Sequence, residues 1–287
     1  MFCSSLQQQV RGNEGASGNA MASLYPQRVV CLTEETTETL YAIHADHVIV
    51  GISGFTMRPA QARKEKPKVS TYLDARFDDI MALQPDVVFA WSDLQADLCA
   101  ELIRRGIDVV CFNHRSIDGI LQMIVRLGAY VGYGPAAEMY AGTLRQRVDA
   151  AVERGAERTS KPLVYFEEWY DPLITGITWV SEIIEICGGI DVFAENRRFP
   201  NAKERILADP LEPVRRNPDI MVASWCGKMF KPDRVRAREG WEHFRPALTQ
   251  QMHEIHSSII LQPGPAALTD GIDAMMSIFD AWEAARV

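Results

Sequence analysis

The chain has 287 residues, of which 47% are hydrophobic, and its formal net charge is -8 at pH 7. This length allows about two domains of ordinary size around a large buried core. The acidic balance disfavours nucleic acid and anionic lipid surfaces as partners, and no apolar run approaches the roughly eighteen residues of a membrane-spanning helix, so we expect a soluble protein.

Residues 1–24 are expected to form a disordered leader. Residues 1–20 are polar and rich in glycine and serine, with neither the basic start nor the apolar stretch of a secretory signal. Cys3 lacks the apolar segment that precedes a lipoprotein cleavage site, and either Met1 or Met21 suits the start of the protein. As written, the sequence therefore indicates a cytoplasmic protein.

Residues 25–134 are expected to form a first α/β lobe. Short β-rich runs alternate there with helical periodicity, which is typical of a parallel sheet with crossover helices. The predicted strands cover residues 28–32, 47–53, 86–90 and 108–112, and the predicted helices cover residues 33–43, 76–83, 94–105 and 117–131.

One long linker helix is predicted over residues 135–160. It begins after Gly134 and Pro135, and its apolar residues recur at helical spacing as far as a charged stretch. These apolar residues are Ala137, Tyr140, Leu144, Val148 and Val152.

Residues 161–287 repeat the alternating pattern and are expected to form a second α/β lobe with a parallel sheet of its own. Strands are predicted over residues 163–169, 219–225 and 257–262, and helices over residues 180–189 and 267–282. The fold class is therefore α/β, with two Rossmann-like lobes and a ligand cleft between them.

Two segments, one in each lobe, share a pattern. Residues 79–90 and 212–223 each place an acid, Asp79 or Glu212, six residues before a Pro-Asp pair, which is followed by a buried strand and then a tryptophan. A helix-turn-strand unit needs a Pro-Asp break in any case, so a coincidental match is the alternative. We favour two related lobes joined by a helix.

The five cysteines beyond the leader are expected to be free thiols that pack as small hydrophobic side chains. Their spacing matches no metal-binding motif, and this usage indicates a reducing compartment. They are Cys31, Cys99, Cys111, Cys187 and Cys226.

The order of these motifs resembles the substrate-binding proteins of ABC transporters for cobalamin and iron-siderophores, whose lobes are joined by a rigid helix. Residues 28–40 are similar to the family's opening strand, Thr/Ser-x-x-Thr-Glu segment and helix, and residues 80–90 to its helix, Leu-x-Pro-Asp, strand signature. Residues 70–91 look most like the cobalamin-binding branch, where aromatics at the positions of Tyr72 and Trp91 line the cleft. The resemblance covers residues 25–282.

This resemblance implies non-catalytic binding of a bulky corrinoid for ABC-type uptake, in a periplasmic protein without a cofactor of its own. An iron-siderophore or haem-type ligand, or a cytoplasmic corrinoid carrier or sensor, are the alternatives. We expect a monomer. Because one helix replaces flexible crossover strands, we also expect only a small hinge motion on binding.

Candidate contacts to the ligand lie in the loops that follow the strands, because ligands of open α/β sheets bind beyond the carboxyl ends of the strands. A corrin is a wide, largely apolar disc edged with amides, so its site needs flat aromatic contact and a few polar groups. The candidates are Thr33, Glu34, Phe55, Arg58, Tyr72, Trp91, Gln95, Glu168, Trp169, Trp179, Trp225, Lys228 and Gln262.

Several of these candidates also have a purely structural interpretation. Trp169 and Trp179 suit packing against the linker helix, and Thr33 suits a helix cap. Arg58 and Lys228 suit solvated surface charges.

In the family, one surface carboxylate of each lobe pairs with arginines of the permease. The matching positions are Asp78 in the first lobe and Glu212 in the second, which is one residue out of that frame. The internal match pairs Glu212 with Asp79 instead, and exposed helical carboxylates are otherwise simple solubility residues.

An enzyme is the main rival interpretation. Glu167, Glu168 and Asp171 lie close together at a strand end, and paired carboxylates can divide acid and base roles. In a strand, however, Glu167 and Glu168 point to opposite faces, and no nucleophile elbow or phosphate-binding loop is present.

A metal site is the third interpretation. His44 and His47 are expected to straddle a helix end, and His253 and His256 to face opposite ways on a strand, so neither pair indicates a site.

Overall fold

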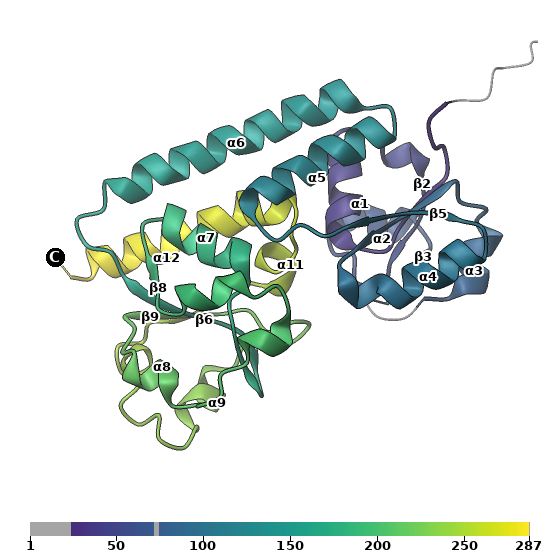
Figure 1. Cartoon of the computed structure of the whole chain (residues 1–287). Helices are drawn as coiled ribbons and strands as arrows, with labels where there is room; N and C mark the ends of the chain where they lie inside the picture. The colour runs from purple at the N-terminus through teal and green to yellow at the C-terminus, as the bar shows by residue number, and fades with distance from the viewer. Residues whose placement is uncertain (1–23, 72–74, 287) are drawn as a thin grey trace, which may run out of the picture.

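The computed structural model describes residues 24–71 and 75–286. The predicted leader, apart from Leu24, and the candidate Tyr72 lie outside the described residues. Figure 1 shows two lobes side by side, with the long helix α6 (Gly134–Ala156) running along both of them. The predicted fold class is confirmed.

The first lobe is built on a parallel sheet in the order β3-β2-β1-β4-β5. Because the strand order reverses between β1 and β4, the crevice of this sheet lies there. The strands are β1 (Val29–Cys31), β2 (Ile49–Ser53), β3 (Lys68–Ser70), β4 (Val87–Trp91) and β5 (Asp108–Phe112).

Five helices belong to this lobe: α1 (Glu34–Ala42), α2 (Ala60–Glu65), α3 (Phe77–Ala82), α4 (Ala96–Arg104) and α5 (Ile117–Tyr130). The four strands and four helices predicted here are confirmed to within a few residues. The sequence missed β3 and α2, because a three-residue strand starting at a lysine and a six-residue charged helix carry too little periodicity.

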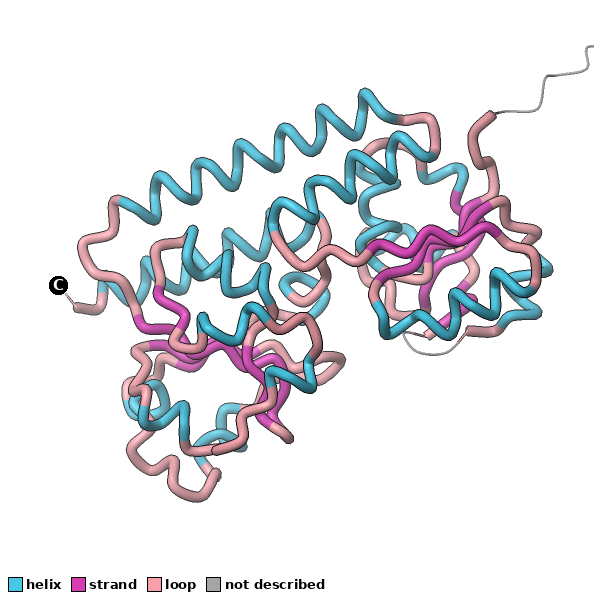
Figure 2. Tube along the Cα trace, viewed as in Figure 1, coloured by secondary structure: helices cyan, strands magenta, loops and turns pink. Residues whose placement is uncertain are grey.

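The linker helix predicted over residues 135–160 corresponds to α6, and the domain limits on either side of it stay a proposal. Pro135 occupies the first turn of α6, where its missing N–H costs nothing. A Cβ atom on Gly128 of α5 would lie 2.2 Å from the Cβ atom of Ala137. The glycine at position 128 therefore lets α5 and α6 pack closely. Figure 2 shows these two helices running side by side.

The sheet of the second lobe is mixed, which corrects the prediction of a parallel sheet. Its order is β10-β9-β6-β7 with β8 beside β6, and β7 runs antiparallel to β6. After β6, the chain turns straight back at Asp171 and Pro172 instead of crossing over through a helix, which allows antiparallel pairing. The strands are β6 (Leu163–Tyr170), β7 (Leu173–Thr175), β8 (Ile190–Asp191), β9 (Ile220–Ala223) and β10 (Met252–Glu254).

The helices of the second lobe are mostly short. Residues 267–271 form a wider π-turn that continues into α12, so the helix predicted over residues 267–282 is confirmed, as is the one over residues 180–189. The helices are α7 (Thr178–Ile186), α8 (Glu212–Arg215), α9 (Pro232–Arg236), α10 (Arg245–Leu248), α11 (Ser257–Ile260) and α12 (Ile272–Ala284).

The strand predicted over residues 257–262 is wrong. The chain forms α11 there, and the last strand is β10 instead. Nδ1 of His256 accepts a hydrogen bond from the backbone N–H of Ser258 at 3.2 Å, which starts the helix. A short apolar run does not distinguish a strand from a buried helical turn. As a consequence, Gln262 follows a helix rather than the last strand.

The two segments that match in sequence form the same Pro-Asp turn, once in each lobe. Gln84 and Asn217, which precede the two prolines, both have a φ of +46°. The backbone N–H of Asp86 donates to the carbonyl of Arg28 at 2.7 Å, and that of Asp219 donates to the carbonyl of Leu163 at 2.7 Å. Each Pro-Asp turn therefore joins its strand to the first strand of its lobe.

The two lobes share one hydrophobic core. A single buried cluster extends from Val29 and Leu40 through α5 and α6 to Trp179 and Trp282. Within the described residues, the structure contains no helix with the length and apolar character needed to cross a membrane.

Candidate functional site

The carboxyl ends of the first sheet face the second lobe, and several of the contacts come from residues 262–270. Nε2 of Gln262 donates to Glu34 at 3.4 Å, and the backbone N–H of Ala266 donates to Glu38 at 3.2 Å. Arg58 pairs with Asp270 at 2.9 Å and with Glu38 at 3.0 Å. Arg58 therefore lies in an ion-pair bridge between the lobes and not free in solvent.

Helix α1 begins with three acids at this boundary. Glu34 is 7% exposed and Glu35 is 1% exposed, and burial raises their pKa values to about 8 and about 7. Burial also raises the pKa of Glu38. The carboxyl groups therefore resist ionisation and suit hydrogen bonding to a polar partner.

Thr33 precedes this helix without capping it by its side chain. Its hydroxyl donates instead to Oε1 of Glu35 at 2.5 Å. The predicted capping role is wrong, because the Thr33 hydroxyl is oriented toward the carboxyl group of Glu35 and accepts no hydrogen bond from the first N–H groups of the helix.

Trp91 lies at the carboxyl end of β4, as the sequence indicated, and is 6% exposed. Its Nε1–H donates to the carbonyl of His114 at 3.2 Å, and the guanidinium of Arg115 lies 4.2 Å from the centre of its ring. Trp179 of the second lobe meets it edge to face. Trp91 therefore belongs to the boundary between the lobes.

His114 continues this boundary. Its Nε2 lies 2.7 Å from the carbonyl oxygen of Pro263, so this nitrogen carries the proton. Burial lowers the pKa of His114 to about 4, which keeps the ring neutral near neutral pH.

Three further candidates are enclosed by protein in this structure. Gln95 accepts a hydrogen bond from the backbone N–H of Trp91 at 3.0 Å and is fully buried. Nε1–H of Trp179 donates to the carbonyl of Ile260 at 2.8 Å, and Nε1–H of Trp225 donates to Glu167 at 3.0 Å. Their roles in binding stay a prediction.

An aromatic stack occupies the carboxyl end of the second sheet. The rings of Trp169 and Tyr170 have centroids 4.9 Å apart, and those of Tyr170 and Trp225 are 4.5 Å apart. Nζ of Lys228 donates to the hydroxyl of Tyr170 at 2.9 Å and lies 5.0 Å from the Trp169 ring centre. The rings are tilted by 36° and 44° against each other. Trp169 and Tyr170 are partly exposed, so this aromatic group offers apolar contact area with a cation at its side.

Exposed apolar side chains stand in loops after the strands of both lobes. Phe55 and Met57 follow β2, Leu94 follows β4, and Met229 follows β9, with exposures of 52%, 46%, 57% and 73%. Of these four residues, Phe55 is among the candidates predicted from the sequence, and Met57, Leu94 and Met229 are not. Their position after a predicted strand is the feature of the sequence that could have identified them.

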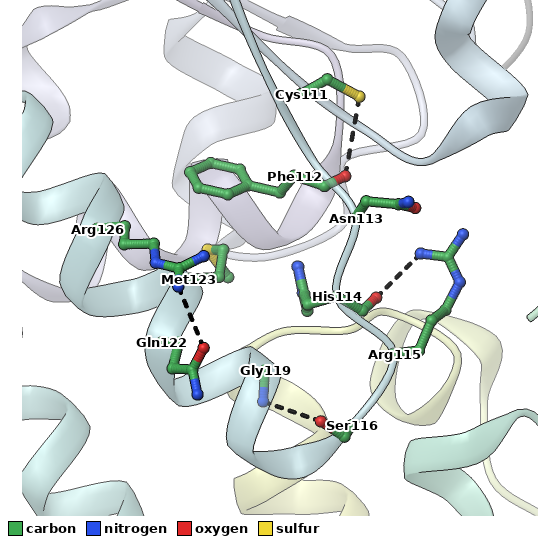
Figure 3. A pocket seen from close by; sticks show the side chains of 10 residues that line it. All are labelled: Cys111, Phe112, Asn113, His114, Arg115, Ser116, Gly119, Gln122, Met123 and Arg126. Carbon is green, nitrogen blue, oxygen red and sulfur yellow. Dashed lines mark hydrogen bonds between the residues drawn. The ribbon is translucent and has the colours of Figure 1, made fainter.

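A cavity of about 360 Å³ lies between the end of β5 and the start of α5 (Figure 3). None of the candidates from the sequence lies in the loop after β5, although this loop also follows a predicted strand. The lining residues are Cys111, Phe112, Asn113, His114, Arg115, Ser116, Gly119, Gln122, Met123 and Arg126.

Of the proposed docking carboxylates, Asp78 and Asp79 are exposed and Glu212 is partly exposed, and all three have partners within the chain. Asp78 pairs with Arg105 at 3.3 Å, Asp79 with Arg76 at 3.0 Å, and Glu212 with Arg215 at 2.7 Å. The repeated Pro-Asp turns make Asp79 equivalent to Glu212, which supports the pairing given by the internal match.

Two of the three carboxylates considered for catalysis, Glu167 and Glu168, are held in separate ion pairs. Glu167 bonds Arg238 at 2.7 Å, and Glu168 bonds Arg205 at 2.7 Å. This matches the prediction that the two side chains point to opposite faces.

No cluster of three or more histidine, cysteine or acidic side chains suits a metal ion within residues 24–71 and 75–286. His44 follows the end of α1 and His47 lies in the next turn, as expected for a pair that straddles a helix end.

The chain matches known proteins along most of its length. The family model described as periplasmic binding protein matches residues 29–257. A vitamin B12-binding protein of Photorhabdus laumondii is 29% identical over 251 residues, which are 85% of each chain. A vitamin B12-binding protein of Vibrio campbellii is 28% identical over 204 residues, which are 69% of this chain and 70% of the relative.

Solved structures agree with the fold. The periplasmic vitamin B12 binding protein BtuF of Vibrio cholerae matches with a TM-score of 0.71 and 19% identity, over 90% of this chain and 98% of that chain. The periplasmic heme-binding protein RhuT from Roseiflexus sp. RS-1 matches with a TM-score of 0.76 and 19% identity, over 89% and 99%.

Proposed function

Because this chain belongs to the periplasmic binding protein family, we propose that it binds a cobalamin-type corrinoid between its lobes and presents it to an ABC permease. Members of this family bind small ligands and work with ABC permeases. The curated relatives over most of the chain are vitamin B12-binding proteins, which supports a corrinoid as the ligand.

The observation that carries the proposal is the set of exposed apolar side chains that follow strands of both lobes. Phe55, Leu94 and Met229 are more than half exposed, and they stand beyond the strand ends of two different lobes. Exposed apolar groups of this size usually mark a binding surface when they gather at one place. A wide apolar disc held between the lobes would cover them from both sides.

Polar groups at the boundary between the lobes suit the amide edge of a corrin. Gln262 and Glu34 meet at the boundary, and burial keeps Glu34 protonated enough to donate as well as accept a hydrogen bond. Lys228 beside Trp169 adds a cation at the rim. These groups would orient the ligand, while the aromatic stack supplies contact area.

Binding without catalysis is part of the proposal. Glu167 and Glu168 each form an ion pair with an arginine, which supports a structural role for both side chains. The family consists of substrate-binding proteins, which supports the same conclusion. We further propose that the protein acts as a monomer in the periplasm.

The test is a titration of the full chain with cobalamin and cobinamide, followed by tryptophan fluorescence, with hemin as the competing probe. We expect saturation at micromolar or lower concentration with the corrinoids and weaker binding of hemin. Phe55→Ser and Met229→Ser should each weaken corrinoid binding several-fold.

Matched controls separate the loops from general surface effects. Ile103 lies on α4, ahead of β5, and is 60% exposed; Leu248 ends α10, ahead of β10, and is 65% exposed. Both residues therefore precede a strand, whereas Phe55 and Met229 follow one. Ile103→Ser and Leu248→Ser should leave the affinity unchanged. Equal losses in all four variants, or tighter binding of hemin than of either corrinoid, would reject the proposal.

A further inference from the structure

Two cations of the second lobe gather at one tyrosine. Nζ of Lys228 donates to the hydroxyl of Tyr170 at 2.9 Å and lies 5.3 Å from the centre of its ring. The guanidinium carbon of Arg234 lies 5.2 Å from the centre of the same ring. Tyr170 ends β6, Lys228 lies in the loop after β9, and Arg234 lies on α9. The packing of three separate segments therefore places two positive charges at one aromatic side chain.

These two cations differ from a neighbouring arginine. Arg236, on the same helix as Arg234, pairs with Asp233 at 2.8 Å. In the part of the chain that the structure describes, neither Lys228 nor Arg234 has a carboxylate within ion-pair distance. Like charges held at one ring repel each other, and an anion beside them would relieve this repulsion. The pair is therefore suited to an anionic group that comes from outside the chain.

The loop that carries Lys228 is held in place by the protein. Phe230 is 7% exposed, and its ring meets that of Trp225 edge to face with centroids 5.1 Å apart. The backbone N–H of Phe230 donates to Oε1 of Glu254 at 2.9 Å, and that of Lys228 donates to the carbonyl of Trp225 at 3.0 Å. Both ends of the loop are fixed, whereas Lys228 itself is exposed. Such preorganisation lowers the cost of ordering the loop when a ligand binds.

The cations lie beside the aromatic stack of Trp169, Tyr170 and Trp225. Nζ of Lys228 lies 5.0 Å from the ring centre of Trp169, so it borders two rings of the stack. Apolar contact area next to a fixed pair of cations suits a ligand whose apolar body carries an anionic group. Ammonium and guanidinium groups both bind phosphate oxygens through charge-assisted hydrogen bonds. On a complete corrinoid, the phosphate of the nucleotide side chain is such a group, whereas the other side chains are neutral amides.

We propose that Lys228 and Arg234 form a subsite for the phosphate of a complete corrinoid. This inference rests on the proposed function and goes beyond it, because it names the part of the ligand that the two cations recognise. An ammonium group has three donors, so Lys228 binds the phosphate while it keeps its hydrogen bond to Tyr170. The protein then prefers corrinoids that carry the phosphate over corrinoids that lack it.

The experiment compares cobinamide with cobinamide phosphate, because these two corrinoids differ by the phosphate alone. Each is bound to the full chain at neutral pH and measured by equilibrium dialysis, with the absorbance of the corrinoid as the readout. We expect cobinamide phosphate to bind about tenfold tighter, which is the effect of one charge-assisted hydrogen bond. The double variant Lys228→Gln with Arg234→Gln should bind both ligands equally, with an affinity for cobinamide close to that of the unmodified protein.

Two control variants retain the subsite. Arg236→Gln removes an exposed arginine of the same helix that already has Asp233 as its partner, so the preference for the phosphate should be unchanged. Lys228→Arg keeps the positive charge and should keep most of the preference. The double variant still binds cobinamide if it is folded, so this ligand also verifies the fold.

Three results would overturn the inference. Equal affinity of the unmodified protein for the two ligands would exclude a phosphate subsite and leave the proposed function intact. A preference that persists in the double variant, or a loss by the same factor for both ligands, would show that Lys228 and Arg234 act only on the aromatic stack. Binding of neither ligand would reject the proposed function together with the subsite.

Discussion

The indole rings of Trp91 and Trp179 meet edge to face across the boundary between the lobes, with centroids 6.0 Å apart and an interplanar angle of 78°. Trp91 ends a strand of the first lobe, and Trp179 lies in the first turn of α7 in the second. Both rings belong to the hydrophobic core that the lobes share. The lobes are therefore fastened to each other by packing as well as by the linker helix.

Removing this contact should destabilise the whole protein. Trp179 is 1% exposed, so Trp179→Ala leaves a large cavity at the boundary and is expected to lower the free energy of unfolding by about 3–5 kcal/mol. Urea denaturation followed by circular dichroism measures this change. Trp169→Ala, at a partly exposed ring, serves as the control and should cost much less. A loss below about 1 kcal/mol for Trp179→Ala would mean that the boundary packs loosely.

The buried acid Glu34 makes stability depend on pH. Its pKa is about 8 in the folded protein, against about 4.5 in the unfolded chain, so its contribution to stability is complete below pH 4.5 and is lost as the pH rises toward 8. Glu34→Gln removes the carboxylate and should stabilise the protein by at least about 1 kcal/mol at pH 8 but little at pH 4.5. Thermal unfolding at both pH values tests the sign. A variant that is stabilised more at pH 4.5 would contradict it.

The repeated Pro-Asp turns should carry stability in both lobes. Oδ2 of Asp86 accepts from the backbone N–H of Arg28 at 2.9 Å, and Oδ2 of Asp219 accepts from that of Leu163 at 2.9 Å. Asp86→Ala and Asp219→Ala should each lower the free energy of unfolding by about 1–3 kcal/mol. The effect at Asp219 should be larger, because it also loses an ion pair with Arg245.

Urea midpoints of these two variants, with the exposed Asp97→Ala as the reference, provide the measurement. Equal midpoints for Asp97→Ala and Asp219→Ala would show that the carboxylate of Asp219 does not stabilise its Pro-Asp turn.

Ligand binding should change the overall shape little. The lobes already touch through Arg58 and Asp270, through His114 and Pro263, and through the two tryptophans. A hinge motion of the lobes would require these contacts to separate. The shared hydrophobic core opposes that separation. Small-angle scattering curves of the free and cobalamin-saturated protein should nearly superimpose. A large decrease in the radius of gyration on binding would reject this prediction.

Charge reversal should separate transport from binding. Asp79 and Glu212 occupy equivalent first turns on the two lobes, where a permease could contact both. Asp79→Arg with Glu212→Arg should reduce corrinoid uptake with the permease of the same host at least tenfold, while cobalamin affinity stays unchanged. Asp97→Arg is the control at another exposed helical acid. Full uptake by the double variant would exclude these residues from docking.

The sequence by itself determined the order of strands and helices, because period and turn chemistry are local properties. The Pro-Asp pairs at Pro85 and Pro218 marked equivalent turns before the structure gave their hydrogen bonds. The position of Trp91 at a strand end was equally visible, since β-rich runs end at recognisable residues. The failures are short segments whose conformation depends on neighbours far away in the chain: α11 was predicted as a strand, and β3, α2, β7, β8, β10, α8, α9 and α10 were not predicted.

Only the tertiary structure decided which side chains lie open and which are enclosed. In sequence, Trp169 and Trp179 are equivalent aromatics, yet one is partly exposed in a stack and the other is sealed in the core. The ion pair between Arg58 and Asp270 likewise depends on how the two lobes pack against each other. Burial and long-range contact are set by packing between distant segments, and no local pattern records which surfaces will meet.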